Sequence, residues 1–184
     1  MIRILSLALA LLLVTVTFGF AQEIDQKYAD KIILLDDEGE ILPVERIYVL
    51  QATYDENGVE YELRGGRSKN KKDGSRILDI TYADAPRVFL EGLQNLARGQ
   101  YAKAESDFDG AKNAVDAGKC RAWLTEHASV RRAQALTALG RKEKGHLPDA
   151  IKEYKAALTA NPKSLLFDEV QIGLVEAYSL QKKW

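Results

Sequence analysis

A pattern of small and aromatic residues occurs twice in the second half of the chain. A glycine is followed by an alanine five residues later, an aromatic residue after four more and an alanine after three more. The first copy comprises Gly99, Ala104, Phe108 and Ala111, and the second comprises Gly145, Ala150, Tyr154 and Ala157. Intervals of three and four place these alanines and the aromatic residue on one face of a helix. Because small residues let two helices approach closely, the pattern predicts paired helices.

Residues that start and stop helices surround the second copy. Gly145 breaks the preceding helix, and Pro148 suits the first turn of the next one. Asn161-Pro162 ends that helix, because the residue before a proline disfavours helical geometry. Similar patterns predict five helices, at about residues 86–98, 101–117, 120–141, 147–160 and 165–182.

The repeated spacing resembles the tetratricopeptide repeat, whose signature ends in an alanine, a spaced aromatic residue and a proline. The resemblance covers roughly residues 86–184. It departs from the family in the separation of the copies, 46 residues instead of about 34, and the first copy lacks the closing proline. Glu91 and Thr137 replace the large residues expected before Gly92 and Ala138. The alternative is two unrelated amphipathic helices.

The region from residue 31 to residue 82 has the pattern of β-strands. Residues 44–54 are rich in β-branched and aromatic side chains, and Val59, Tyr61 and Leu63 alternate with acidic residues. Asn57-Gly58 is a strong hairpin signal. We expect about four antiparallel strands, forming a small curled sheet or an SH3-like barrel. A module of some 50 residues without a disulfide has a marginal core, so it should pack on the first helix pair.

The first 21 residues have the pattern of a secretory signal. Arg3 precedes an apolar run over residues 4–20, and Gly19-Phe20-Ala21 is a small-x-small cleavage site. We therefore expect an exported protein, periplasmic or attached to the cell envelope or secreted, with no membrane span after cleavage. An uncleaved anchor is the alternative, since the apolar run is at the short limit for a span. The predicted fold class is α+β: signal 1–21, β module 22–84 and tetratricopeptide-like helical domain 85–184.

No combination of residues predicts catalysis, a cofactor or a metal site. Neither His127 nor His146 has a cysteine or histidine at metal-ligand spacing. Cys120 lies two helical turns from His127, about 10 Å, which is too far for a nucleophile and its base. We expect Cys120 to be a small buried residue, although a single cysteine in an exported protein can also pair with another chain. The acidic run at 36–40 lacks the ligand spacing of a calcium loop and is predicted to form a turn.

The resemblance implies a non-enzymatic scaffold that binds another protein on a concave surface lined by the first helix of each pair. A net charge of −1 gives no global attraction to nucleic acid. The candidate partner-binding residues are Asn95, Arg131, Gln134, Arg141, Leu174 and Tyr178. The last helix is expected to leave apolar surface open for self-association or a partner, unless its whole apolar face is used internally.

An alternative function concerns the basic segment at residues 64–76, which carries six basic residues and one acid. As a loop it would bind an anion or a glycan through Arg67, Lys69, Lys71 and Lys72. It contains no aromatic residue on which a nucleic-acid base could stack. A solvated hairpin loop is the purely structural interpretation.

Overall fold

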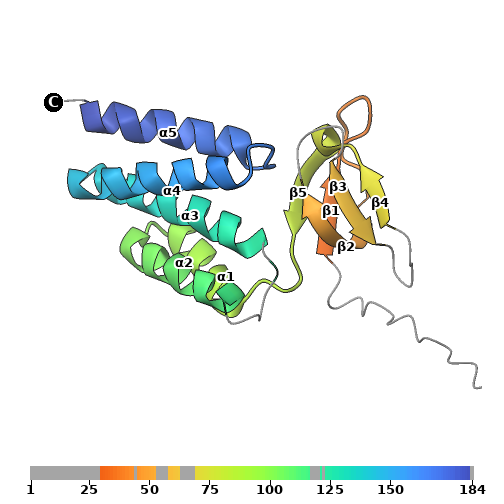
Figure 1. Cartoon of the computed structure of the whole chain (residues 1–184), viewed down its shortest axis with the longest axis horizontal. Coiled ribbons are helices and arrows are strands. Elements are labelled where there is room, and N and C mark those ends of the chain that lie inside the picture. Colours follow the sequence, from red (N-terminus) through yellow and green to blue (C-terminus); the bar gives the residue numbers. More distant parts are fainter. Residues whose placement is uncertain are drawn as a thin grey trace, which may run out of the picture.

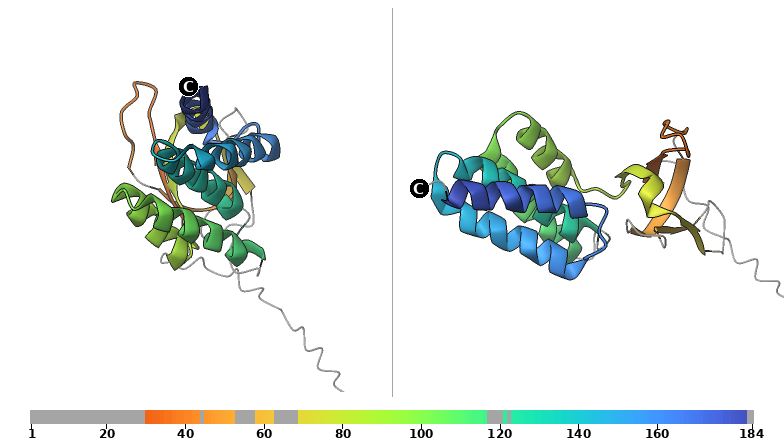
Figure 2. Two further views of the ribbon diagram at one scale, coloured as in Figure 1. Left: turned by 90° about the vertical axis from the view of Figure 1, so that its left-hand side faces the viewer. Right: turned by 90° about the horizontal axis from the view of Figure 1, so that it is seen from above.

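The computed structural model describes residues 30–43, 45–52, 58–62, 69–116, 121 and 123–182 of the 184-residue chain. An antiparallel β module and a stack of α-helices lie side by side, joined by residues 82–86 (Figures 1 and 2). The predicted α+β class is therefore correct. The predicted signal peptide and Cys120 lie outside the described residues. Among the described helices, none has the length and apolar character needed to cross a membrane.

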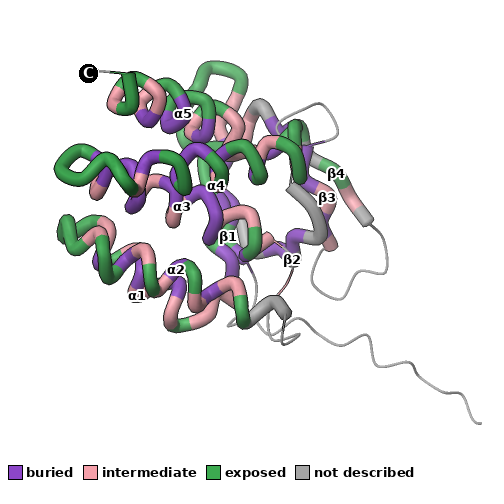
Figure 3. The backbone as a smooth tube through the Cα atoms, turned by 60° about the vertical axis from the view of Figure 1, so that its left-hand side comes forward, coloured by how far each residue is buried: buried purple, intermediate pink, exposed green. Residues whose placement is uncertain are grey.

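All five predicted helices are present. They are α1 (Arg87–Ala97), α2 (Tyr101–Asp116), α3 (Trp123–Gly140), α4 (Leu147–Ala160) and α5 (Phe167–Lys182). Each helix packs against the next one in sequence, with their buried sides facing one another (Figure 3). Helix α1 begins one residue later than expected, because Pro86 is its extended N-cap. Pro148 lies in the first turn of α4, and Asn161 caps its end, as predicted.

The repeated aromatic residues lie between helices. Phe108 and Tyr154 are almost fully buried, with exposed fractions of 0% and 1%. A Cβ atom at Gly92 would lie only 2.7 Å from Cε1 of Phe108, so glycine is what allows α1 and α2 to approach. Tyr154 packs in the same way against Gly173 of α5, a position that the sequence pattern did not reveal.

Helix α5 uses most of its apolar face internally, so the expected open edge is not where it was predicted. Leu174 is buried beside Tyr154, and Tyr178 is partly buried, with the Lys155 ammonium 5.4 Å from its ring centre. The exposed apolar side chains of α5 are instead Ile172 and Val175. They lie on the outer side of the helix.

The described residues of the β module form five strands, where about four were expected. They are β1 (Asp30–Leu34), β2 (Glu45–Ala52), β3 (Val59–Glu62), β4 (Lys69–Lys72) and β5 (Ile77–Thr81). The order is β4-β3-β2-β1-β5, with every neighbouring pair antiparallel. The first half of β2 pairs with β1 and its second half with β3, so two small sheets share this strand. Closure into an SH3-like barrel remains a prediction.

The expectation that residues 64–76 form one loop is wrong, because β4 lies within this segment. Its sequence, Lys-Asn-Lys-Lys, has little intrinsic strand preference. Pairing with β3 supplies the stabilisation instead: Lys71 lies directly across from Glu60, and opposite charges in that position favour the pair. A 3-10 turn, η2 (Gly74–Arg76), then leads into β5.

The core of the module includes Val59 and Tyr61, which follow the predicted alternation along β3. Its buried members are Ile32, Leu34, Ile47, Val49, Val59, Tyr61, Ile80 and Tyr82. The acidic run after β1 is a turn, as predicted. The Asp36 carboxylate accepts hydrogen bonds from the backbone N–H of Glu38 and Glu40, and Gly39 has a φ of 84°, which favours glycine.

Candidate binding cleft

Aromatic rings join the β module to the start of α3. Tyr82, just after β5, stacks on Trp123 with ring centres 4.0 Å apart and planes 8° from parallel. His127, one turn further along α3, contacts both rings edge-on. Phe89 of α1 meets the edge of Trp123 at 5.6 Å. The module therefore rests on Trp123 of α3 and on Leu165, in the connection between α4 and α5, and not on the first helix pair as expected.

A buried ionic cluster reinforces this junction. Nη2 of Arg121 lies 2.7 Å from Asp30 Oδ1 and 2.6 Å from Asp84 Oδ1, and its Nη1 donates to the carbonyl oxygen of Val49. The Asp30 side chain is fully buried and also accepts hydrogen bonds from the backbone N–H of Val49 and Ala83. We call Asp30, Asp84 and Arg121 the Arg121 clasp. It links β1, β2 and the connection after β5 to the residues that precede α3.

The hydrogen bonds of the clasp set the charge states at the junction. Burial by itself would raise the pKa of Asp84, but the bonds from Arg121 and from Nε1 of Trp123 outweigh it and hold the pKa well below its usual range. Burial, reinforced by the charge of Asp30, raises the pKa of Tyr82. At neutral pH the Asp84 carboxylate is therefore ionised while the Tyr82 ring beside it stays neutral.

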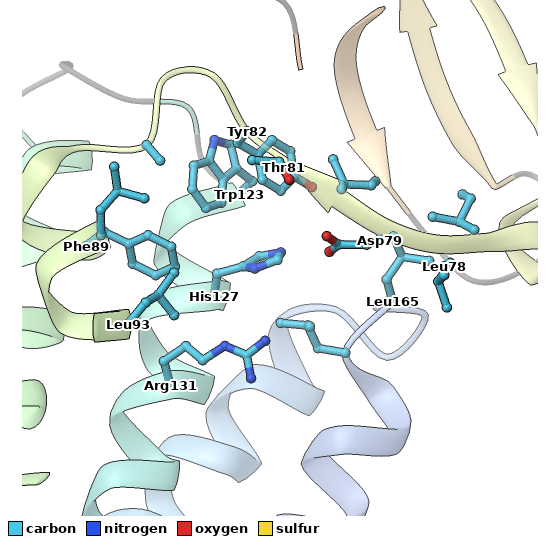
Figure 4. A pocket seen from close by; sticks show the side chains of 15 residues that line it. Leu78, Asp79, Thr81, Tyr82, Phe89, Leu93, Trp123, His127, Arg131 and Leu165 are labelled. Carbon is cyan, nitrogen blue, oxygen red and sulfur yellow. The ribbon is translucent and has the colours of Figure 1, made fainter. Parts of the chain in front are cut away.

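A cleft of about 250 Å³ opens beside this junction (Figure 4). One wall is formed by β5, whose five residues all line it. The opposite wall is formed by α1 and α3, and the connection between α4 and α5 closes one end. The apolar lining includes Phe89, Leu93 and Leu165. Leu78 and Leu90 also line the cleft with exposed fractions of 53% and 45%.

Besides Tyr82, three titratable side chains line the cleft. Burial, helped by the charge of Arg131, lowers the pKa of His127 to about 3, so its imidazole is neutral at physiological pH. Arg131 is paired with Glu169 and donates to Gln134, whose amide also donates to Glu169 at 2.7 Å. Asp79 is exposed, and Figure 4 shows its carboxylate directed into the cleft. No other described residue forms a hydrogen bond or ion pair with this carboxylate.

The predicted partner-binding residues are scattered by the fold. Arg131 lines the cleft, and Gln134 holds its partner Glu169 in place. Asn95 is buried and donates to Asp107 at 2.6 Å. Arg141 pairs with Glu176 at 2.6 Å on the surface. Leu174 and Tyr178 pack within the helical stack, as described above.

The predicted anion-binding residues lie at the opposite edge of the module from the cleft. Lys69, Lys71 and Lys72 belong to β4, and Arg67 lies outside the described residues. Lys71 is exposed but stands across from Glu60. In the backbone the three lysines belong to one short strand, so they share no turn or loop.

Sequence reasoning did not identify the clasp or Asp79. Arg121 and Asp30 are 91 positions apart, so no local spacing joins them. Asp30 is the first residue of the apolar strand β1 and Arg121 lies two residues before α3, and a lone charge at the start of such an element is the only local signal. In the described part of the chain, no group of three or more histidine, cysteine, aspartate or glutamate residues is arranged to hold a metal ion.

Comparisons with protein-family models, with curated proteins and with solved structures found no match to this chain. The geometry of the cleft is therefore the main basis for proposing a function.

Proposed function

We propose that this protein is a non-enzymatic scaffold that binds another polypeptide in the cleft between β5 and helices α1 and α3. The supporting observation is an apolar cleft bordered by the exposed side chains of Leu78 and Leu90. Exposed apolar surface next to polar groups is typical of protein interaction sites. The cleft is smaller than the roughly 300–1,000 Å³ of small-molecule pockets, which favours a few side chains of a larger partner.

The helical part supports the same proposal. We infer that α1 with α2, and α3 with α4, are tetratricopeptide-like pairs, and that α5 begins a third. The cleft is lined by α1 and α3, the first helices of two such pairs, which is the side that these repeats use for binding. The signal-like first 21 residues favour a location in the periplasm or the cell envelope.

Site-specific photo-crosslinking tests this proposal. A photoreactive amino acid at Leu90, on the border of the cleft, should capture a polypeptide partner in the organism that makes the protein. The same amino acid at the exposed Lys152, on α4, is the control and should not capture that partner. Leu90→Glu should also abolish co-purification of the captured partner. Equal capture from both positions, or co-purification unaffected by Leu90→Glu, would contradict binding in the cleft.

Binding of an anion or a glycan by the basic strand β4 is the weaker alternative. Cross-strand pairing with Glu60 offsets the charge of Lys71. If this alternative holds, Lys71→Ala should reduce retention on an immobilised acidic polysaccharide, whereas Leu90→Glu should not.

A further inference from the structure

Strand β5 forms one edge of the module, and the cleft runs along it. In the strand order β4-β3-β2-β1-β5, its neighbour within the described residues is β1. An edge strand has a row of backbone N–H and C=O groups that can pair with another chain. All five residues of β5 line the cleft, including members of both faces, so the cleft follows the unpaired side of the strand over about 17 Å.

Apart from Asp79, the side chains of β5 carry no charge that would protect this edge. Natural edge strands are commonly protected from pairing by lysine and other charges. Strand β4 fits that description with the sequence Lys-Asn-Lys-Lys, whereas β5 reads Ile-Leu-Asp-Ile-Thr. The helices stand over β5 instead, but they leave the cleft open beside it. An extended segment entering there would meet backbone groups on one side and apolar side chains such as Phe89 and Leu93 on the other.

The charges in the cleft determine which charge on an incoming segment is favoured. Arg131 is already paired with Glu169, and the imidazole of His127 is neutral. Asp79 therefore presents the one carboxylate in the lining that the described residues leave unneutralised. An entering segment that carries a basic side chain beside an apolar one complements this surface.

The same carboxylate argues against a second copy of this chain as the occupant. Asp79 is the central residue of β5. Antiparallel pairing of two β5 strands about their centres would place the two Asp79 carboxylates directly opposite each other. Like charges in that arrangement destabilise strand pairing.

Resting on the proposed function, we propose that the occupant of the cleft is an extended segment of another protein, rich in alternating apolar and basic residues, which pairs with β5 as an added strand. Main-chain hydrogen bonds to the edge would supply affinity. An apolar side chain in the cleft and a basic one beside Asp79 would supply specificity.

Synthetic peptides test this pairing on the purified protein. The probe is a blocked nine-residue peptide in which lysine alternates with valine or leucine. Two N-methylated versions, each methylated along one edge, cannot donate backbone hydrogen bonds from that edge. We expect the unmethylated peptide to shift the NMR signals of the β5 amides and slow their hydrogen exchange. One of the two methylated versions should bind at least about tenfold more weakly, because strand pairing depends on those donors.

Charge reversal tests the role of Asp79. The parent protein should prefer the lysine peptide to its glutamate counterpart, and Asp79→Lys should reverse that preference. Lys71→Glu, a reversal at the exposed lysine of the other edge, is the matched control and should leave both affinities unchanged. A thermal melt of Asp79→Lys that matches the parent verifies that the fold is intact, and Asp79→Asn serves as a second variant if it is not.

Several outcomes would overturn strand addition. These are equal binding by both methylated peptides, shifts confined to β4 or α5, or no binding by any peptide at millimolar concentration. Shifts at β5 that appear on concentrating the protein alone would make a second copy the occupant. If crosslinking at Leu90 succeeds while the peptide results fail, the scaffold function stands without strand addition. If crosslinking at Leu90 also fails, the proposed function fails too.

Discussion

The two outer strands of the β module are protected in different ways. Strand β4 faces solvent and carries lysines, whose charge and hydration oppose pairing with another chain. Strand β5 is mostly apolar and lies beside the helical stack, which restricts access to it. Charge protects an edge from every partner, whereas a covering wall with a cleft admits only a segment of suitable shape. The difference makes β5 the edge suited to specific recognition.

The protection of β5 depends on the Arg121 clasp. Without it, the stacked rings of Tyr82 and Trp123 would be the main contact that keeps the module against α3. The β4 edge needs no such support, because its protection is in its own side chains. The following predictions test this contrast, beginning with the largest expected effect.

Arg121→Met should destabilise the protein and expose β5. The variant leaves the fully buried Asp30 carboxylate without its cation, and breaking a buried ion pair from one side costs roughly 3–5 kcal/mol. We expect a markedly lower melting temperature by circular dichroism and increased association in light scattering. Arg141→Met, which removes the exposed pair with Glu176, is the control and should cost only about 0–1 kcal/mol. Equal melting of the two variants would refute a role for the clasp.

Lowering the pH should reduce the free energy of unfolding, because His127 beside β5 becomes protonated more easily in the unfolded chain. Its pKa is about 3 in the folded protein and about 6.5 when unfolded, so the unfolded chain binds the proton first. Stability should therefore fall as pH decreases from about 6.5 to 3, by at most about 1.4 kcal/mol per pH unit. The imidazole is partly exposed, so water stabilises its charged form and the dependence of stability on pH is weaker than this limit.

Denaturant unfolding across this pH range measures the effect. His127→Phe should remove the slope between pH 6.5 and 4. Asp84 should contribute below about pH 4, because its pKa is lowered on folding and its stabilisation is lost as pH falls. His146→Asn, at a turn remote from the cleft, should retain the parent slope. An unchanged slope in His127→Phe would show that another group titrates.

Lys71→Val should have the smallest effect on stability. It removes the cross-strand pair with Glu60, which is worth roughly 0.2–1 kcal/mol. It also removes charge from the β4 edge, so we expect more self-association by sedimentation analysis than for the parent. Lys152→Val, at an exposed position of α4, is the matched control and should sediment like the parent. Equal association of both variants would mean that edge charge does not protect β4.

The local sequence pattern was sufficient to predict most of the secondary structure. The periodicity around Phe108 and Tyr154 predicted paired helices, and alternation around Tyr61 predicted a buried strand face. Strand β4 was missed because its stability comes from pairing with β3, including Lys71 across from Glu60, and not from its own residue preferences. On α5, Leu174 and Val175 are adjacent and equally apolar, yet one is buried and the other exposed. The position of α4 decides which of them is inside.

The sequence by itself determined the α+β class, the positions of the five helices and the lack of a local catalytic motif, because these depend on residues a few positions apart. Only the tertiary structure decided that Asp30 meets Arg121, that Tyr82 stacks on Trp123 and that β5 borders a cleft with Asp79 directed into it. Those contacts join residues dozens of positions apart. Their energies depend on burial and on hydrogen-bond geometry, which arise only when the module and the helices come together.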